Sequence, residues 1–364
     1  MTFSLKHSSL KEKLSQGGID IAESEAVPAL ETPWFVRALQ AFSGWLAALF
    51  LLGFIGMGAV FILDSSVAAA LLGLVMIAGA YAALRGRSGD FLEHLALAGS
   101  LAGQLLVAWA LGSVLGDVNA GFWWSLVGLQ GVLALVMPSL THRTFSAFAA
   151  SLAFYLALIE GTAAPSLAGG LLLLAATLLW LNEFRRPAYI RQCQALGYGL
   201  LLGVLAIQAM GYHGESLFLG HYHHVTGLAW LEPWAGDALA TLAFVLLLRH
   251  VFRRYQPAIA ARAWMAAYAA AAGLMLLSLQ AHGLSHGVLV IALGFAIGNR
   301  AIMALGVILL LMAGASYYYW LDVTLLAKSA TLFVLGLLLL ALRWVLRRRW
   351  PGGMPVVARE GESQ

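Results

Sequence analysis

Charged residues are scarce in this chain of 364 residues. Only 10% are Asp, Glu, Lys or Arg, whereas 61% are hydrophobic and the mean hydropathy is +0.85. Soluble domains carry about 25% charged residues. Each charged side chain costs roughly 2.5–3.5 kcal/mol at the centre of a membrane helix, which accounts for the scarcity. The composition therefore predicts an integral membrane protein.

Cysteine and catalytic signatures are nearly absent. Cys193 stands alone, which excludes an internal disulfide and a thiolate metal cluster. Neither a GxxxxGK[ST] phosphate loop nor an HExxH zinc motif occurs, and no basic nucleic-acid-binding face is visible. The pattern GxSxG occurs at 283–287, but it requires a strand–turn–helix setting and here lies between two predicted membrane helices. We expect no ATP or nucleic-acid partner, and the sequence does not favour an enzyme.

Twelve apolar segments follow one another along the chain, and a membrane span needs about 20 such residues. They predict an all-α polytopic helix bundle of about 12 transmembrane helices in one domain, residues 35–349. Residues 1–34 are expected to form a cytoplasmic segment with a short amphipathic helix, and 350–364 a disordered cytoplasmic tail. The predicted spans are 40–63, 66–84, 91–115, 120–138, 144–161, 164–182, 189–211, 233–251, 260–281, 284–298, 301–321 and 324–346.

Basic residues are confined to one side of these spans. Every Lys and Arg of the 21 except Lys328 lies on that side, and the alternate connections carry none. Cytoplasmic loops are enriched in Lys and Arg. The pattern predicts a multi-pass protein with both termini in the cytoplasm.

Small and amide residues inside the spans predict close helix packing. Gly99 and Gly103 are four residues apart and share one helix face, where small side chains let helices approach closely. Gln104, Gln130 and Gln208 are expected to form hydrogen bonds between helices rather than to line a path.

Three polar residues, Asp90, Glu93 and His94, begin the third span on the basic side. Asp90 is placed to cap the helix, and a Glu side chain near a helix amino end complements the helix dipole. We interpret this group mainly as a helix cap.

Histidines gather on the predicted outer side. On a helix His282 and His286 share one face, and an extended chain places His221 and His223 on one face. Neutral imidazoles bind zinc, copper or nickel, and they titrate near pH 6.5. The alternatives are a divalent-metal site, a pH-sensing group and a polar loop with hydrogen-bonded histidines, and we favour the last, without a cofactor. The six outer histidines are His213, His221, His223, His224, His282 and His286.

Lys328 is the one basic residue that orientation does not explain. It lies about five residues inside the last span, or about 7 Å deep at 1.5 Å per residue. Its side chain can snorkel to the surface, but a cation near a helix amino end opposes the helix dipole. We therefore expect a partner for it, either Asp322, Asp237 or an external anion.

Two runs of sequence resemble a known bacterial family. They are 314–329, with three consecutive tyrosines and Leu-Leu-Ala-Lys-Ser, and 97–104, Leu-Ala-Gly-Ser-Leu-Ala-Gly-Gln. Both resemble polytopic membrane proteins classed as domain of unknown function 4401, and the segment 34–45 fits as well. Members of this family have no established activity and are often encoded beside a second membrane family and an exported protein with a GDYXXLXY sequence. The resemblance implies a bacterial inner-membrane location and a protein partner, and it adds Ser329 and Tyr318 to the outer candidate residues Lys328, Asp322 and Asp237.

Two functions fit these features best. One is a membrane-embedded partner or scaffold for an exported protein, and the alternative is a secondary permease for a small solute or lipid. Major facilitator permeases share twelve spans with both ends inside, but their long central cytoplasmic loop is reduced here to residues 183–188. We favour the scaffold, and an enzyme acting on a lipid-linked substrate comes third.

Overall fold

The protein was examined as a computed structural model. It describes residues 64–320, except 87–89, 117, 163, 186, 214–228, 233, 256–260 and 279–282, and isolated positions within 35–57 and 326–340. The described residues form helices and no strand. In chain order these are α4 (Ser66–Arg85), α5 (Asp90–Leu115), α6 (Ala120–Val136), α7 (Leu140–Thr162), α8 (Ser166–Leu181), η1 (Glu183–Arg185), η2 (Pro187–Tyr189), α9 (Ile190–His213), η3 (Ala229–Leu231), α11 (Ala235–Tyr255), α12 (Ala261–Ser278), α13 (Leu284–Ile297) and α14 (Arg300–Trp320).

The all-α prediction is confirmed, and ten of the twelve predicted spans coincide with helices α4 to α14. The first and last predicted spans, 40–63 and 324–346, lie outside the continuously described residues. Five described helices are long and apolar enough to cross a membrane, and α6, α8, α13 and parts of α12 and α14 are apolar but shorter. The count of twelve crossings stays a prediction.

Local sequence signals set several helix ends. Ser65 and Asn119 accept hydrogen bonds at their side chains from the backbone amides of Ala68 and Phe122, which caps α4 and α6. Gly298 ends α13 with φ 73°, a left-handed conformation that glycine adopts without steric cost. Asn299 then accepts bonds from the first amides of α14.

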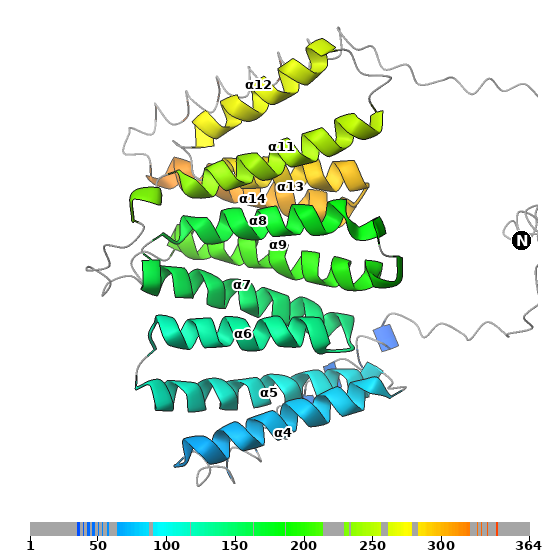
Figure 1. Cartoon of the computed structure of the whole chain (residues 1–364), viewed down its shortest axis with the longest axis vertical. Coiled ribbons are helices and arrows are strands. Elements are labelled where there is room, and N and C mark those ends of the chain that lie inside the picture. Colours follow the sequence, from blue (N-terminus) through cyan, green and yellow to red (C-terminus); the bar gives the residue numbers. More distant parts are fainter. Residues whose placement is uncertain are drawn as a thin grey trace, which may run out of the picture.

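Consecutive helices run in opposite directions and are stacked in a row, from α4 and α5 at one end to α11 and α12 at the other (Figure 1). The largest buried apolar cluster joins α8, α9, α11, α13 and α14, and a separate cluster joins α4, α5 and α6. The alternation brings the described arginines to one common edge of the row. They lie at the ends of α4 and α11, in η1, or in the first turns of α7, α9, α12 and α14: Arg85, Arg143, Arg185, Arg191, Arg249, Arg253, Arg254, Arg262 and Arg300.

Glycines allow the closest helix contacts. A Cβ built on Gly103 of α5 would lie 2.5 Å from the carbonyl oxygen of Gly73 on α4, and one on Gly199 of α9 would lie 2.5 Å from that of Thr144 on α7. Gly99, by contrast, has no atom within 4 Å of its Cβ position. The predicted tight packing therefore holds for Gly103 and does not extend to Gly99.

Candidate functional site

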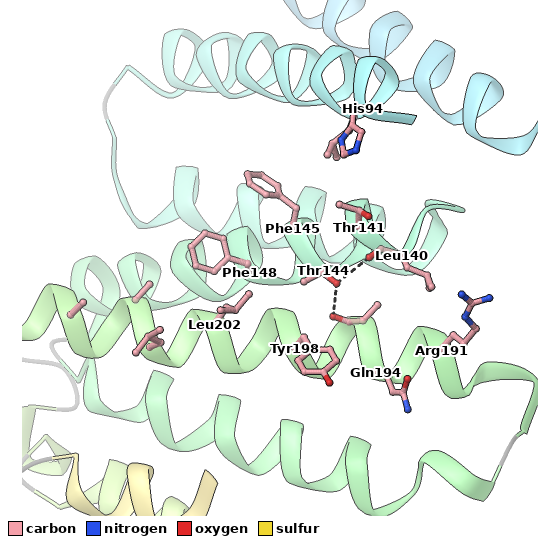
Figure 2. Close-up of a pocket in the computed structure, with 15 residues that line it drawn as sticks. His94, Leu140, Thr141, Thr144, Phe145, Phe148, Arg191, Gln194, Tyr198 and Leu202 are labelled. Atoms are coloured by element: carbon pink, nitrogen blue, oxygen red, sulfur yellow. Dashed lines mark hydrogen bonds between the residues drawn. The ribbon is translucent and has the colours of Figure 1, made fainter. Parts of the chain in front are cut away.

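An open cavity of about 1010 Å³ lies between α5 on one side and α7 and α9 on the other. α5 packs mainly on α4, whereas α7 packs mainly on α6 and α9, and this leaves space between α5 and the α7–α9 pair. Figure 2 shows His94 on the α5 wall and Arg191, Gln194 and Tyr198 on the α9 wall. We call this cavity the lateral cleft.

The polar lining of the lateral cleft is concentrated where the three helices begin. His94 lies in the second turn of α5, Thr141 and Thr144 lie in the first two turns of α7, and Arg191 and Gln194 lie in the first two turns of α9. The Thr144 hydroxyl is 3.0 Å from the Leu140 carbonyl and 3.1 Å from the Ala195 carbonyl, and so holds α7 against α9 (Figure 2). This polar end of the cleft lies at the edge of the row where the described arginines gather, which we call the arginine edge.

The remaining lining of the lateral cleft is apolar except for Tyr198. The Tyr198 hydroxyl accepts a hydrogen bond of 2.6 Å from the side-chain amide of Asn299, the residue directly before α14. The apolar wall follows α7 and α9 toward their other ends and consists of Phe145, Phe148, Leu202, Leu205, Ala206 and Ala209. The lateral cleft thus has one polar end and a long apolar remainder.

A buried polar network connects the helices that flank the cleft. The His142 ring on α7 lies with Nε2 2.8 Å from the Ser100 hydroxyl on α5 and with Nδ1 3.1 Å from the Ser146 hydroxyl. Gln130 on α6 donates a bond of 2.8 Å to Gln104 on α5, whose own amide nitrogen donates to Ser100 at 3.1 Å. All five side chains are buried. The predicted interhelical roles of Gln104 and Gln130 are confirmed, and His142 is a residue that sequence reasoning missed.

A second buried cluster joins α11, α12 and α13 at the opposite edge of the row. The Asp237 carboxylate accepts bonds from the Ser278 hydroxyl at 2.5 Å and the Ser285 hydroxyl at 2.6 Å, and all three residues are buried. Ser285 belongs to the GxSxG pattern, whose first glycine, Gly283, starts α13 with φ 89°. A carboxylate can bind several hydroxyl donors at once, so these contacts fasten the amino end of α11 to the α12–α13 connection.

Nearby, Glu232 binds the start of α8. Its carboxylate accepts from the Ser166 backbone amide at 3.0 and 3.3 Å, and the Ser166 hydroxyl donates to the Glu232 carbonyl at 3.0 Å. A carboxylate at this position satisfies helix amides that have no partner within the helix.

Only part of the predicted outer site can be located. Ser329 is exposed, and its hydroxyl donates to the Leu326 carbonyl at 2.9 Å. Tyr318 is half-buried in α14. Lys328 and Asp322 lie outside the described residues, so the expected pairing of Lys328 with Asp322, Asp237 or an external anion stays a prediction.

Of the five candidate histidines of the metal or pH-sensing hypothesis, the structure describes the side chain of one. His286 is half-buried in α13, with its Cε1 atom 3.0 Å from the Cβ position of Gly169 on α8. His221, His223, His224 and His282 lie outside the described residues. Within the described ranges no three His, Cys, Asp or Glu side chains are placed to share a metal ion.

The basic-side trio takes up different roles. The Glu93 carboxylate accepts a bond of 2.6 Å from the Ser139 hydroxyl, which ties the start of α5 to the start of α7. His94 lines the lateral cleft, and its Nδ1 atom is buried without a hydrogen-bond partner among the described residues. The contribution of His94 to a cavity was not predicted, and the capping role of Asp90 stays a prediction.

The helices and their apolar surfaces define the class of this molecule as an all-helical membrane protein. Within that class, the chain belongs to the family described as Domain of unknown function (DUF4401), whose model matches residues 33–349. No curated protein and no solved structure matches it. The match confirms the resemblance of runs 314–329 and 97–104, and it assigns no activity.

Proposed function

We propose that this protein is a membrane-embedded scaffold that holds another membrane or exported protein at the bacterial inner membrane. The main support is that the buried polar side chains form hydrogen bonds with one another across neighbouring helices. The His142 network joins α5, α6 and α7, and the Asp237 cluster joins α11, α12 and α13. Polar side chains that bond to one another across helices stabilise a fixed arrangement, as a scaffold requires.

The location and orientation are part of this proposal. The arginine edge of the row is the cytoplasmic one, in keeping with the enrichment of basic residues in cytoplasmic loops. The opposite edge, which carries η3, Asp237 and the start of α8, then faces outward, where an exported partner would be met. Trp230 on η3 lies at this edge and is 67% exposed. Exposed tryptophan is enriched at protein interfaces.

Site-specific photocrosslinking in living cells tests this proposal. A photoreactive amino acid replaces Trp230 at the outer edge or, as the control, Phe184 of η1 at the arginine edge, which is 68% exposed. The scaffold predicts a discrete adduct with another protein from position 230 and none of that mass from position 184. Position 230 giving lipid adducts alone, or both positions giving the same adducts, contradicts the proposal.

A permease for a small solute or lipid is the second candidate, and the lateral cleft is the observation that favours it. Its volume of about 1010 Å³ is at the upper limit of the roughly 300–1,000 Å³ typical of small-molecule sites. Solute or lipid flux into vesicles that contain this chain alone would support the permease. Vesicles that remain as tight as protein-free ones, combined with a protein adduct at position 230, support the scaffold.

A further inference from the structure

The lateral cleft combines a basic end with a long apolar wall inside the membrane domain. We propose that it is a binding site for an anionic phospholipid of the surrounding bilayer, with the headgroup phosphate at Arg191 and one acyl chain along α7 and α9. The site would serve a scaffold and a permease alike, so this inference goes beyond the proposed function and does not depend on it.

The charges at the basic end favour an anion. Arg191 is exposed at the start of α9, and within the part of the chain that the structure describes it forms no hydrogen bond or ion pair. Two carboxylates beside the cleft form hydrogen bonds of their own, since Glu93 accepts from Ser139 and Glu183 accepts from Gln194. A guanidinium binds phosphate oxygens through two parallel hydrogen bonds, which makes Arg191 the expected headgroup contact.

Other polar groups at this end can complete a headgroup site. Thr141 is exposed in the cleft, and the His94 Nδ1 atom has no partner among the described residues. Arg143 is buried and does not line the cleft, and its guanidinium donates to the Met137 carbonyl at 2.6 Å and to the Gln192 side-chain oxygen at 3.4 Å. The phosphate is therefore expected to depend on one arginine rather than on both.

The apolar wall has the length that an acyl chain needs. From Arg191 to Leu202 is eleven residues along α9, or about 16 Å at 1.5 Å per residue. Half of the hydrocarbon core of a bilayer is about 15 Å. A phosphate held at Arg191 would thus lie near headgroup depth, while the wall of Phe145, Phe148 and Leu202 would follow one leaflet to its middle.

The distribution of polarity distinguishes a lipid from a water-soluble solute. Beyond the second turns of α7 and α9, Tyr198 is the sole polar side chain of the lining, and its hydroxyl is bonded to Asn299. A polar solute in that part of the cleft would lose hydrogen bonds with water and regain few, whereas an acyl chain has none to lose.

Lipid binding to the purified full-length chain, measured by native mass spectrometry in mild detergent, tests this proposal. The probes are phosphatidylglycerol, which is anionic, and phosphatidylcholine, which is zwitterionic. Arg191→Ala is expected to weaken phosphatidylglycerol binding about tenfold or more, as loss of a charge-assisted hydrogen bond implies. Arg191→Lys is expected to keep an intermediate affinity, and phosphatidylcholine is expected to bind weakly to every variant.

The matched control is Arg185→Ala, which removes an exposed arginine of η1 at the same edge but outside the cleft. It should leave phosphatidylglycerol affinity unchanged. Equal losses in Arg185→Ala and Arg191→Ala would mean that general surface charge, and not the cleft, attracts the lipid, and this would overturn the proposal.

The acyl-chain half of the site is tested separately. Ala206→Phe fills the apolar wall and is expected to reduce phosphatidylglycerol binding severalfold, whereas Ala304→Phe on an exposed face of α14 should not. Ala209→Leu is a milder filling variant if Ala206→Phe does not yield a monodisperse protein. Unchanged lipid binding in the filling variants overturns the proposal. If the mass spectra show a dimer of the chain, and the filling variants abolish the dimer without changing lipid binding, the cleft is a contact with a second copy and the proposal is overturned as well.

Discussion

Replacement of His142 by alanine should destabilise the protein strongly, because the ring is fully buried between two helices. His142→Ala removes the bonds to Ser100 and Ser146, which span 2.8 and 3.1 Å. The bond to Ser100 joins α7 to α5, and interhelical hydrogen bonds in membrane proteins contribute about 0.6–1.7 kcal/mol each. The bond to Ser146 lies within α7 and contributes about 0.5–1.5 kcal/mol, so the two together contribute about 1–3 kcal/mol. The void left by the ring adds about 1–2 kcal/mol at about 24 cal/mol per Å³. We expect the free energy of unfolding to fall by about 2–5 kcal/mol.

The assay uses the single cysteine of the chain. Cys193 on α9 is half-buried, so its reaction with a thiol-specific dye reports unfolding during titration with a denaturing detergent. His250→Ala, at an exposed position of α11, is the control and should change the free energy by less than about 0.5 kcal/mol. A His142→Ala variant as stable as His250→Ala would refute the reasoning. The double variant His142→Ala/Ser146→Ala should be less destabilised than the sum of the single variants, because both remove the same bond.

Three further predictions concern packing, the second polar cluster and the outer edge. Gly103→Ala should lower the melting temperature, because the added Cβ would meet the backbone of α4. Gly99→Ala should leave the melting temperature unchanged or raise it slightly, since no atom lies near its Cβ position. A Gly99→Ala variant that melts at a lower temperature than Gly103→Ala would contradict the observed packing. Ser285→Ala should lower the free energy of unfolding by about 1–2 kcal/mol because it removes a donor to a buried carboxylate. Ser113→Ala, at an exposed site, is the control and should be nearly neutral. Equal changes in the free energy of unfolding for the two variants would show that the Asp237 cluster does not stabilise the fold. Lys328→Ala should reduce recovery of a protein partner from membranes and Lys328→Arg should retain part of it, and full recovery with alanine would remove Lys328 from the site.

The positions of the described helices could be predicted well because the length of each hydrophobic run largely determines them. The span predicted at 66–84 is observed as Ser66–Arg85, and that at 189–211 as Ile190–His213. The clearest difference is α7, which begins at Leu140 rather than at 144. Polar residues 141–143 suggested a connection, but the His142 ring and the Arg143 guanidinium find partners on neighbouring elements, and the helix therefore includes them.

The lateral cleft could not be predicted from sequence. Its lining comes from three helices between residues 94 and 209, and it depends on how closely α5 approaches α7 and α9, which no local pattern encodes. Asp237 was identified as a candidate because Lys328 was expected to need an anionic partner near the outer side. Its bonds to Ser278 and Ser285 depend on the relative placement of α11, α12 and α13, and so on tertiary packing.

The composition of the complex formed in native membranes tests the scaffold most directly. The tagged full-length chain would be extracted in mild detergent, and the molar ratio of each co-purifying protein to the chain would be measured by quantitative mass spectrometry, with Trp230→Ala as the comparison. We predict one membrane or exported protein at a near-stoichiometric ratio, reduced severalfold by Trp230→Ala. Recovery of the chain with no protein near stoichiometry, together with solute or lipid flux in vesicles that contain it alone, would contradict the account.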